Sequence, residues 1–186
     1  MSSQPSFDCL SPIEQTKREI QALLSQIERP GMEDLLLALQ KSDFFDMPAS
    51  TKYHGNFRGG LALHSLKVFQ AAIALTEAWP VPVKSDSVVI CSLLHDVCKI
   101  GAYKKDGEGW IPADDYFPYG HGEASVRWIE QYMTLDYHEA LAIRWHMGAY
   151  EDGDRRLLSA AMKDPLVLLI HTADMVASAL MEEARK

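Results

Sequence analysis

The sequence has few cysteines, no long hydrophobic run and no surplus of positive charge. Its three cysteines, Cys9, Cys91 and Cys98, form no CxxC spacing, which argues against a disulfide framework and against a thiolate zinc site. No stretch approaches the roughly 18 uninterrupted apolar residues of a membrane-spanning helix, and no basic start followed by an apolar run opens the chain. We therefore predict a cytoplasmic protein with no membrane partner, in which Cys91 and Cys98 pack as small apolar residues.

The negative charge limits the possible partners. A formal net charge of -8 at pH 7 and a pI near 5.3 disfavour long nucleic acid, because duplex binding depends on neutralising many phosphates with Lys and Arg. Small ligands remain possible, since a few local cations suffice for them. With 47% hydrophobic residues, 9 Pro and 11 Gly among 186 residues, the composition is that of one ordinary globular domain, or of a domain with a short extension.

Helical periodicity runs through nearly the whole chain and predicts an all-α fold. The expected helices cover about seven segments: 11–29, 32–42, 60–79, 85–101, 119–133, 135–146 and 164–186. Ser11 can cap the first of them and Pro12 suits its first position. Gly101 is expected to end the fourth as a left-handed cap. The segment YKKDGEGWIP, with DG at its turn, predicts a short hairpin near residues 103–111.

Polar side chains recur at interior positions of these helices. One apolar stripe runs from Leu61 to Trp79 at steps of three and four residues, and His64 lies in it. The whole set comprises His64, His95, Asp96, His121, His146 and Asp174. A single buried histidine can be a core residue with a hydrogen-bond partner, because buried polar groups destabilise unless they are paired. A cluster of neutral imidazoles and carboxylates is instead well satisfied around a divalent cation, to which each side chain gives a lone pair.

Three motifs resemble the HD superfamily of metal-dependent phosphohydrolases, whose signature is a His, a His-Asp pair and a distant Asp on successive helices. GGLALHSLKV places His64, LLHDVCKIG places His95 and Asp96, and LIHTADMV places Asp174. The resemblance spans about residues 50–182. It implies an all-α HD domain over residues 50–186, with residues 1–49 forming N-terminal helices that pack on its core.

Two further motifs resemble the subgroup of this superfamily that binds two metals. GHGEAS places His121, and IRWHMGAY places His146, at the additional histidine positions of that subgroup. The subgroup includes HD-GYP phosphodiesterases, HD-type CRISPR nucleases and HD-type diadenosine tetraphosphate hydrolases. The segment STKYHGNFRGGLALHSL is similar to the HD domains of bacterial exoribonucleases.

The resemblance implies one or two divalent transition metal ions. Asp96 would bridge two ions, and a hydroxide between them would attack the phosphorus. The remaining ligands would divide into His64, His95 and Asp174 at one ion and His121 and His146 at the other. Nitrogen and oxygen donors of this kind suit Fe, Mn, Co, Ni or Zn. His171, one turn before Asp174, is expected to be a core residue or an outer partner of the ligands.

Cations near this centre are candidates for substrate binding. Lys99 lies three residues after Asp96, on nearly the same face of the expected helix, so its ammonium could bind a phosphate or protonate a leaving oxygen. The alternative is a solvated lysine near a helix C-terminus. Lys52, His54 and Arg58, in the turn-rich loop before residue 60, could bind substrate phosphate or be ordinary exposed cations.

The sequence thus predicts a metal-dependent hydrolase that cleaves a phosphoester or phosphoanhydride bond in a small nucleotide or related phosphorylated metabolite. Asp96 and Lys99 are its predicted catalytic residues. Two alternatives stay open: a single-strand nuclease that acts with a partner, and a non-catalytic domain that binds metal and nucleotide as a sensor. Steep salt dependence of binding would favour the nuclease. Turnover of any member of a nucleotide panel would exclude the sensor.

Overall fold

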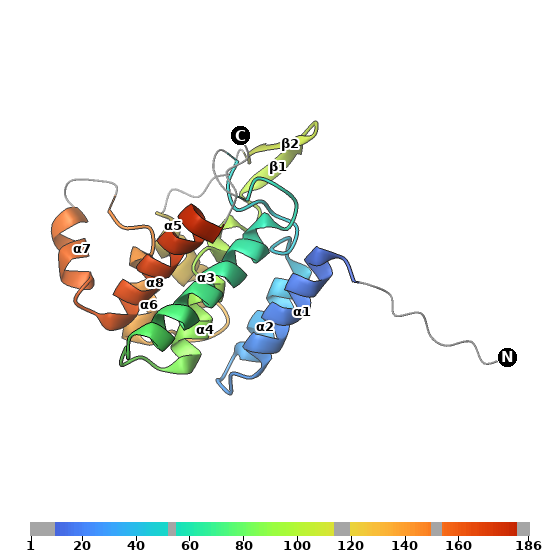
Figure 1. Cartoon of the computed structure of the whole chain (residues 1–186). Coiled ribbons are helices and arrows are strands. Elements are labelled where there is room, and N and C mark those ends of the chain that lie inside the picture. Colours follow the sequence, from blue (N-terminus) through green and yellow to red (C-terminus); the bar gives the residue numbers. More distant parts are fainter. Residues whose placement is uncertain (1–9, 52–54, 114–119, 150–153, 182–186) are drawn as a thin grey trace.

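The computed structural model describes residues 10–51, 55–113, 120–149 and 154–181. Within these ranges the chain is a bundle of α-helices with one small hairpin (Figure 1). The α-helices are α1 (Pro12–Ser25), α2 (Met32–Lys41), α3 (Gly60–Ala78), α4 (Ser85–Leu94), α5 (His121–Ile129), α6 (Tyr137–Trp145), α7 (Arg155–Ala161) and α8 (Pro165–Val176). The hairpin joins β1 (Tyr103–Asp106) and β2 (Gly109–Pro112), and two short segments are 3-10 helical, η1 (Val97–Lys99), and π-helical, η3 (Ala177–Met181). The predicted all-α class with a short hairpin is confirmed.

Capping residues explain where several helices begin. The hydroxyl of Ser11 accepts a hydrogen bond from the amide of Glu14 at 3.3 Å, and Pro12 occupies the first position of α1. A capping box opens α6, in which the side chains of Asp136 and Glu139 each accept a hydrogen bond from the other residue's amide. These bonds satisfy amides that the start of a helix otherwise leaves without partners.

The helices pack around one hydrophobic core. α3 packs against α4 and α8, α6 packs against α5 and α8, and α1 packs against α2, α3 and α4. In Figure 1, α1 and α2 lie on one side of this group and α7 on the other, while the hairpin projects at the top. The buried cluster includes Ile20 of α1, Leu35 of α2, Leu61 of α3, Leu94 of α4 and Ile170 of α8. The N-terminal helices therefore share the core, and the boundary at residue 49 stays a prediction.

The fourth helix ends earlier than the periodicity predicts. α4 stops at Leu94 instead of continuing to Gly101, and Asp96 has φ -111° and ψ 17°, outside helical values. The ring of His95 gives one reason. Its Nδ1 lies 2.9 Å from the carbonyl oxygen of Ser92, the acceptor that the next amide would use in a continuing helix. Gly101 has the predicted left-handed conformation, with φ 70°, but it follows η1 and not α4.

Two other details differ from the sequence prediction. The described residues contain eight α-helices instead of about seven, because α7 is additional. α7 is 7 residues long and buries only Ala161, so it has no extended apolar stripe by which a helix can be recognised. Trp79, at the end of the predicted stripe in α3, is 64% exposed, because it adopts the extended conformation that ends this helix.

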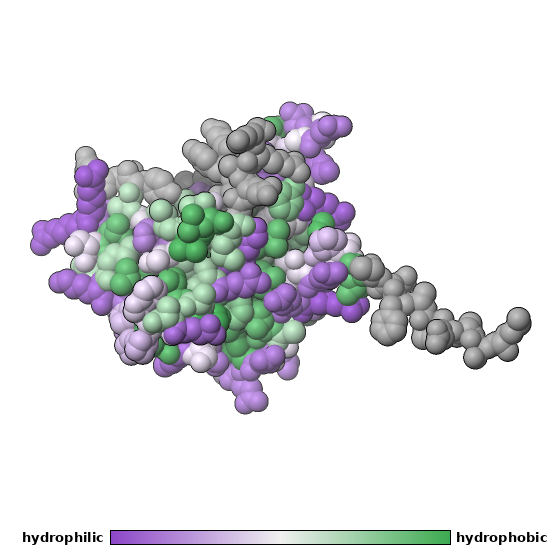
Figure 2. Space-filling view, viewed as in Figure 1, coloured by the Kyte–Doolittle hydropathy of each residue, from purple (hydrophilic) through white to green (hydrophobic). Residues whose placement is uncertain are grey.

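Hydrophobic side chains also lie on the surface. Figure 2 shows hydrophobic residues among hydrophilic ones on the face viewed, and Leu168, Met175 and Leu180 are among the exposed residues. Within the described ranges, no helix taken alone has the length and hydrophobicity of a membrane span. The pair Arg155–Ala161 and Pro165–Met181 meets these criteria only when both are taken together, and it is bent by 111°.

A partly buried ion pair connects the N-terminal helices to the rest of the bundle. The carboxylate of Glu139, on α6, lies 2.6 Å from Nη1 of Arg29 and accepts a hydrogen bond at 2.8 Å from Ser87, on α4. Arg29 also donates to the carbonyl oxygen of Thr134 at 2.6 Å. Because Arg29 lies between α1 and α2, these contacts hold the connection between the two N-terminal helices against α4 and α6.

We expect Glu139→Ala to lower the free energy of unfolding by roughly 2–4 kcal/mol, because it leaves Arg29 and Ser87 without their shared partner and removes half of the α6 capping box. Lys84→Ala is the matched control. It breaks a pair with Asp136 in which the lysine side chain is 79% exposed, so the expected loss is only about 0–1 kcal/mol. Chemical denaturation measures both losses, and equal values would contradict a structural role for the Glu139 network.

Candidate metal centre

The structure brings together the six polar residues of the predicted ligand set. They are His64 in α3, His95 and Asp96 directly after α4, His121 at the start of α5, His146 directly after α6 and Asp174 in α8. The three histidines other than His121 are at most 1% exposed, and Asp96 is 3% exposed. Residues that are up to 110 positions apart in the sequence therefore place their side chains in one cluster, in which His121 and Asp174 are partly exposed.

The donor atoms of this cluster lie close to one another. Nε2 of His64 is 3.2 Å from Nε2 of His95 and 3.2 Å from Oδ1 of Asp174. Asp96 faces three of the histidines: its Oδ2 is 3.5 Å from Nε2 of His95 and 3.8 Å from Nε2 of His64, and its Oδ1 is 3.4 Å from Nε2 of His146. Asp96 therefore lies at the centre of the arrangement.

Backbone carbonyls determine the tautomers of two of these histidines. Nδ1 of His95 lies 2.9 Å from the carbonyl oxygen of Ser92, and Nδ1 of His146 lies 2.7 Å from that of Ile143. A carbonyl oxygen can only accept, so in both rings Nδ1 carries the hydrogen. In the neutral imidazole, Nε2 then has its lone pair free and directed into the cluster, as a metal ligand requires.

These separations and the unpaired atoms fit a divalent ion. Two nitrogen or oxygen donors at about 2.0–2.1 Å from one tetrahedral ion are about 3.3–3.4 Å apart, close to the 3.2 Å and 3.4 Å measured here. Oδ1 of Asp96 and Nε2 of His146 are buried and have no hydrogen-bond partner among the described residues. Buried polar atoms are rarely left in this state. The cluster can therefore hold a metal ion.

The electrostatics keep the carboxylates charged. Burial alone would raise the pKa of Asp96, but the nearby Lys99 and His95 outweigh this and hold it well below its usual value. Burial would likewise raise the pKa of Asp174, and the hydrogen bond from His64 reverses the effect. Burial lowers the pKa of His95, which favours its neutral form. Burial alone would also lower the pKa of His146, but the nearby carboxylate of Asp96 raises it overall.

His121 lies beside Cys98, which the sequence predicts to pack as a small apolar residue and not to be a ligand. Its Nδ1 is 3.5 Å from Sγ of Cys98, and Asp96, Cys98 and His121 form a donor group, separate from the group of His95, Asp96 and His146. Burial raises the pKa of the Cys98 thiol to about 12, and it lowers the pKa of His121. Cys98 is two positions after Asp96, on the opposite face if the helix continued, so only the turn after Leu94 brings the two together.

Lys99 is buried against the same carboxylate. Its Nζ is 2.6 Å from Oδ2 of Asp96, and the residue is only 8% exposed. Burial alone would lower the pKa of Lys99, but the charge of Asp96 raises it above its usual value, so the side chain is an ammonium. Tyr103 lies nearby, and burial raises its pKa. The predicted alternative of a solvated lysine is therefore wrong, while a role in substrate binding stays a prediction.

The predicted loop cations are only partly described. Lys52 and His54 lie outside the described residues. Arg58 forms a surface ion pair with Asp46 at 2.7 Å, and its side chain is 65% exposed. Its predicted contact with substrate stays a prediction. His171 agrees with the predicted supporting role, since its Nδ1 donates to the carbonyl oxygen of His146 at 2.7 Å.

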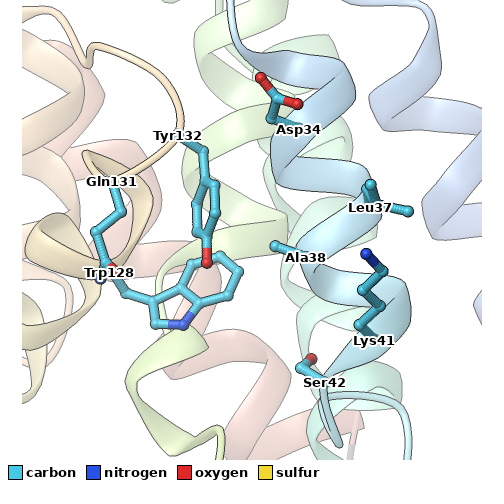
Figure 3. Close-up of a pocket in the computed structure, with 8 residues that line it drawn as sticks. All are labelled: Asp34, Leu37, Ala38, Lys41, Ser42, Trp128, Gln131 and Tyr132. Atoms are coloured by element: carbon cyan, nitrogen blue, oxygen red, sulfur yellow. The ribbon is translucent and has the colours of Figure 1, made fainter.

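Two pockets lie on the surface of α5. One, of about 300 Å³, opens beside His121 and is lined by Gly120, His121, Gly122, Glu123, Arg144, Met147, Gly148 and Asp154. The other, of about 580 Å³, lies between α2 and the end of α5 with the turn that follows it, where Trp128 of α5 and Tyr132 of the turn face Ala38 (Figure 3). None of the residues that line this second pocket belongs to the donor groups, whereas the first is lined by one donor residue, His121.

Gly122 sets the distance between α5 and α6 next to His121. A Cβ at this position would lie 2.2 Å from the carbonyl oxygen of Arg144. We expect Gly122→Ala to lower the free energy of unfolding by about 1–3 kcal/mol, because the two helices must move apart. It should also weaken metal binding that depends on His121. Gly109→Ala is the control, since its Cβ would meet only the carbonyl oxygen of Asp106, at 3.6 Å. Thermal melting with and without added metal measures both effects, and an unchanged Gly122→Ala protein would contradict the close contact.

Residues 61–179 match the family model described as the HD domain. The chain belongs to the HD domain family. The matched segment includes all six predicted ligands, Cys98 and Lys99. The resemblance of the motifs to the HD superfamily is therefore confirmed.

Several curated proteins are similar to about half of the chain. A dihydroneopterin 2',3'-cyclic phosphate phosphodiesterase of Methanocaldococcus jannaschii is 29% identical over 96 residues, which cover 50% of this chain and 36% of that protein. The 3'-5' exoribonucleases YhaM of Geobacillus sp. and Listeria welshimeri are 30% and 28% identical over 90 residues, which cover 47% of this chain and 28% of each exoribonuclease. The chain thus matches only about a third of the length of these relatives. No solved structure shows significant similarity to it.

Proposed function

We propose that this HD domain is a metal-dependent phosphohydrolase that cleaves a phosphoester or phosphoanhydride bond in a small nucleotide or related phosphorylated metabolite. The observation that carries the proposal is the convergence of three histidine Nε2 atoms and two carboxylates in the protein interior. A core that served stability alone would hold apolar residues there, because buried polar atoms without partners destabilise the folded state. A bound cation would give these buried polar atoms a partner and so account for their position in the core.

The proposed ligands divide into two sets that share one carboxylate. The first ion would be held by His64, His95, Asp96 and Asp174, and the second by Asp96, His121 and His146. The position of Asp96 supports the shared role, since its two oxygens face histidines on different sides. Bound divalent ions supply Lewis-acid activation of water and of phosphoryl oxygens, which is the chemistry that phosphate hydrolysis needs.

Lys99 and Asp96 are the proposed catalytic pair among the chain's own residues. The ammonium of Lys99, fixed by its 2.6 Å contact with Asp96, can donate a hydrogen bond to a phosphoryl oxygen placed beside the carboxylate. It can also give a proton to the leaving oxygen as the phosphorus–oxygen bond breaks. The buried environment strengthens both interactions relative to water. Substrate would enter through the pocket beside His121.

The preference for a small substrate rests on charge. The chain carries a net charge of -8, which opposes the approach of a long polyanion. The relative named as a 2',3'-cyclic phosphate phosphodiesterase supports a small phosphodiester as one substrate class. The relatives named as exoribonucleases favour the second candidate, a single-strand nuclease that acts with a partner. A domain that binds metal and nucleotide without turnover is the third.

A panel assay at physiological salt separates these candidates. Metal-free protein is given Fe²⁺, Mn²⁺, Co²⁺, Ni²⁺ or Zn²⁺ and tested on cyclic nucleotides, mononucleotides, dinucleoside polyphosphates and single-stranded RNA. We expect turnover of at least one small compound, dependent on added metal and removed by a chelator. Degradation of long RNA faster than any small compound would favour the nuclease. Tight metal and nucleotide binding without turnover would leave the sensor.

A further inference from the structure

Cys98 is placed as a metal ligand would be. Its Sγ lies 3.5 Å from Nδ1 of His121, and one donor atom each of Asp96, Cys98 and His121 lies within 4.8 Å of the other two. A sulfur at about 2.3 Å and a nitrogen at about 2.0–2.1 Å from one tetrahedral ion are about 3.5 Å apart. The measured separation therefore has the value expected when Sγ and an imidazole nitrogen bind the same ion.

The buried carboxylate of Asp96 supports the same site. Asp96 is 3% exposed, and its Oδ1, which lies 3.4 Å from Nε2 of His146, has no hydrogen-bond partner among the described residues. One carboxylate oxygen of Asp96 also lies within 4.8 Å of a donor atom of Cys98 and of His121, so the residue supplies a third donor and a negative charge there. We infer that Asp96, Cys98 and His121 form a site for a thiophilic divalent ion such as Zn²⁺, Fe²⁺ or Co²⁺, with Cys98 as a direct sulfur ligand. This inference rests on the proposed function and deepens it, because it adds the sulfur of Cys98 to the proposed ligands of the second ion.

The fold holds Cys98 in this position by contacts that are independent of a metal. The turn after Leu94 allows Cys98 and Asp96 to face the same space. The amide of Cys98 then donates to the hydroxyl of Ser125 at 3.2 Å, and Ser125 is fully buried on α5. Ser125 is one turn after His121, so the two share a face of α5. The bond therefore fixes the sulfur and the imidazole relative to each other.

A sulfur ligand restricts the identity of the ion. Thiolate favours softer ions such as Zn²⁺, Fe²⁺ and Co²⁺, whereas Mg²⁺, Ca²⁺ and Mn²⁺ prefer oxygen. On binding, the Cys98 thiol loses its proton to solvent and its sulfur gives an electron pair to the ion, with no change of oxidation state. The thiolate and the Asp96 carboxylate together neutralise the two positive charges of the ion. The competing explanation is a weak hydrogen bond from the Cys98 thiol to His121, with no role in metal binding.

Cobalt distinguishes these explanations, because a thiolate bound to Co²⁺ gives a charge-transfer band in the near ultraviolet. Metal-free protein in a Cys9→Ser background is titrated with Co²⁺ while the absorbance and the number of bound ions are measured. Cys98→Ala removes the proposed ligand. Cys91→Ala is the matched control, since Cys91 is also buried but its sulfur contacts the carbonyl oxygen of Glu139 at 3.8 Å. We expect the band in the background and in Cys91→Ala, and no band in Cys98→Ala.

A competition titration with Zn²⁺ adds a second readout. Loss of even an outer partner of a metal ligand weakens binding by about 10- to 100-fold, so Cys98→Ser should weaken binding of the second Zn²⁺ by at least that factor. Its affinity for Mn²⁺ should change less. The serine hydroxyl still reaches His121 as a hydrogen-bond donor, so an unchanged affinity for Zn²⁺ would support the hydrogen-bond explanation and overturn the inference.

The outcomes for this inference and for the proposed function differ. If the background protein binds Co²⁺ without the band, Cys98 is not a ligand, and the inference fails while the metal centre stands. A band that persists in Cys98→Ala has the same meaning. If no divalent ion binds and hydrolysis is unaffected by chelators, the proposed function fails as well. The result in the background protein decides the first question even if Cys98→Ala does not fold.

Discussion

The Asp96→Ala protein should show no metal-dependent hydrolysis, and added metal should no longer raise its melting temperature. Asp96 belongs to two of the donor groups and faces His64, His95 and His146, so its removal weakens both proposed sites together. A metal that binds only the folded state stabilises it by about 2.7 kcal/mol at a concentration 100 times its dissociation constant. The wild-type protein should show a stabilisation of this order, and the variant should show none.

A second effect of the substitution appears without metal. Lys99 is 8% exposed and loses the carboxylate that lies 2.6 Å from its ammonium. Removing one member of such a buried pair should destabilise the metal-free protein by about 3–5 kcal/mol, since the remaining charge has no partner. Asp96→Asn is the matched control, because the amide keeps the shape and can still accept from Lys99 but supplies no charge to an ion. Melting curves with metal and with a chelator separate the two effects. Full activity of Asp96→Ala in the presence of metal would show that the site is wrongly assigned.

Much of the fold follows from local patterns in the sequence. Ser11 and Pro12 begin α1 by interactions within one helical turn, and these can be read without knowing the rest of the fold. The end of α4 cannot be predicted in this way, because it depends on the hydrogen bond between the ring of His95 and the carbonyl oxygen of Ser92. The helix α7 cannot be predicted from its pattern either, since it buries only Ala161. Features that depend on one side-chain rotamer or on a neighbouring helix leave no periodic signal.

The residues of the candidate site also differ in how well the sequence predicts them. His64, His95 and Asp174 stand out because polar residues on apolar helix faces need partners, and the motifs identify those partners. Cys98 gives no such signal, because a cysteine is as common in a core as an alanine. Its proximity to His121 arises from the turn after Leu94 and from the bond to Ser125. The sequence therefore predicts the centre of the cluster better than its border with α5.

The number of bound ions should separate the two ligand sets. Wild-type protein saturated with Fe²⁺ or Mn²⁺ should hold about two ions per chain, shared through Asp96. Replacing His121 by alanine should release one of them, because this residue belongs only to the group with Asp96 and Cys98. The donor group of His64, His95 and Asp174 is untouched by that change and should keep the other ion.

His146→Ala should also release one ion, but by a different route. Its Nε2 groups with His95 and Asp96, so its loss removes a proposed ligand of the second ion that lies next to a ligand of the first. For both variants we expect the rate to fall by roughly 100-fold or more, because loss of a partner outside the ligands already lowers activity by 10–100-fold. His138→Ala is the control, since its side chain is 62% exposed and pairs with Asp164, away from the cluster.

The physical reason for the large loss is that the two ions serve different charges in the transition state. One ion held by the His64 set would make a water nucleophilic near neutral pH, and a second held by Asp96, His121 and His146 would neutralise charge that develops on the phosphoryl oxygens. Lys99 alone cannot replace the second ion, because its ammonium is already paired with Asp96. In the competing view, His121 and His146 donate hydrogen bonds to substrate above a single ion. Elemental analysis decides between them: a wild-type protein that never exceeds one ion per chain, even when saturated, would refute the binuclear centre and leave a mononuclear HD enzyme.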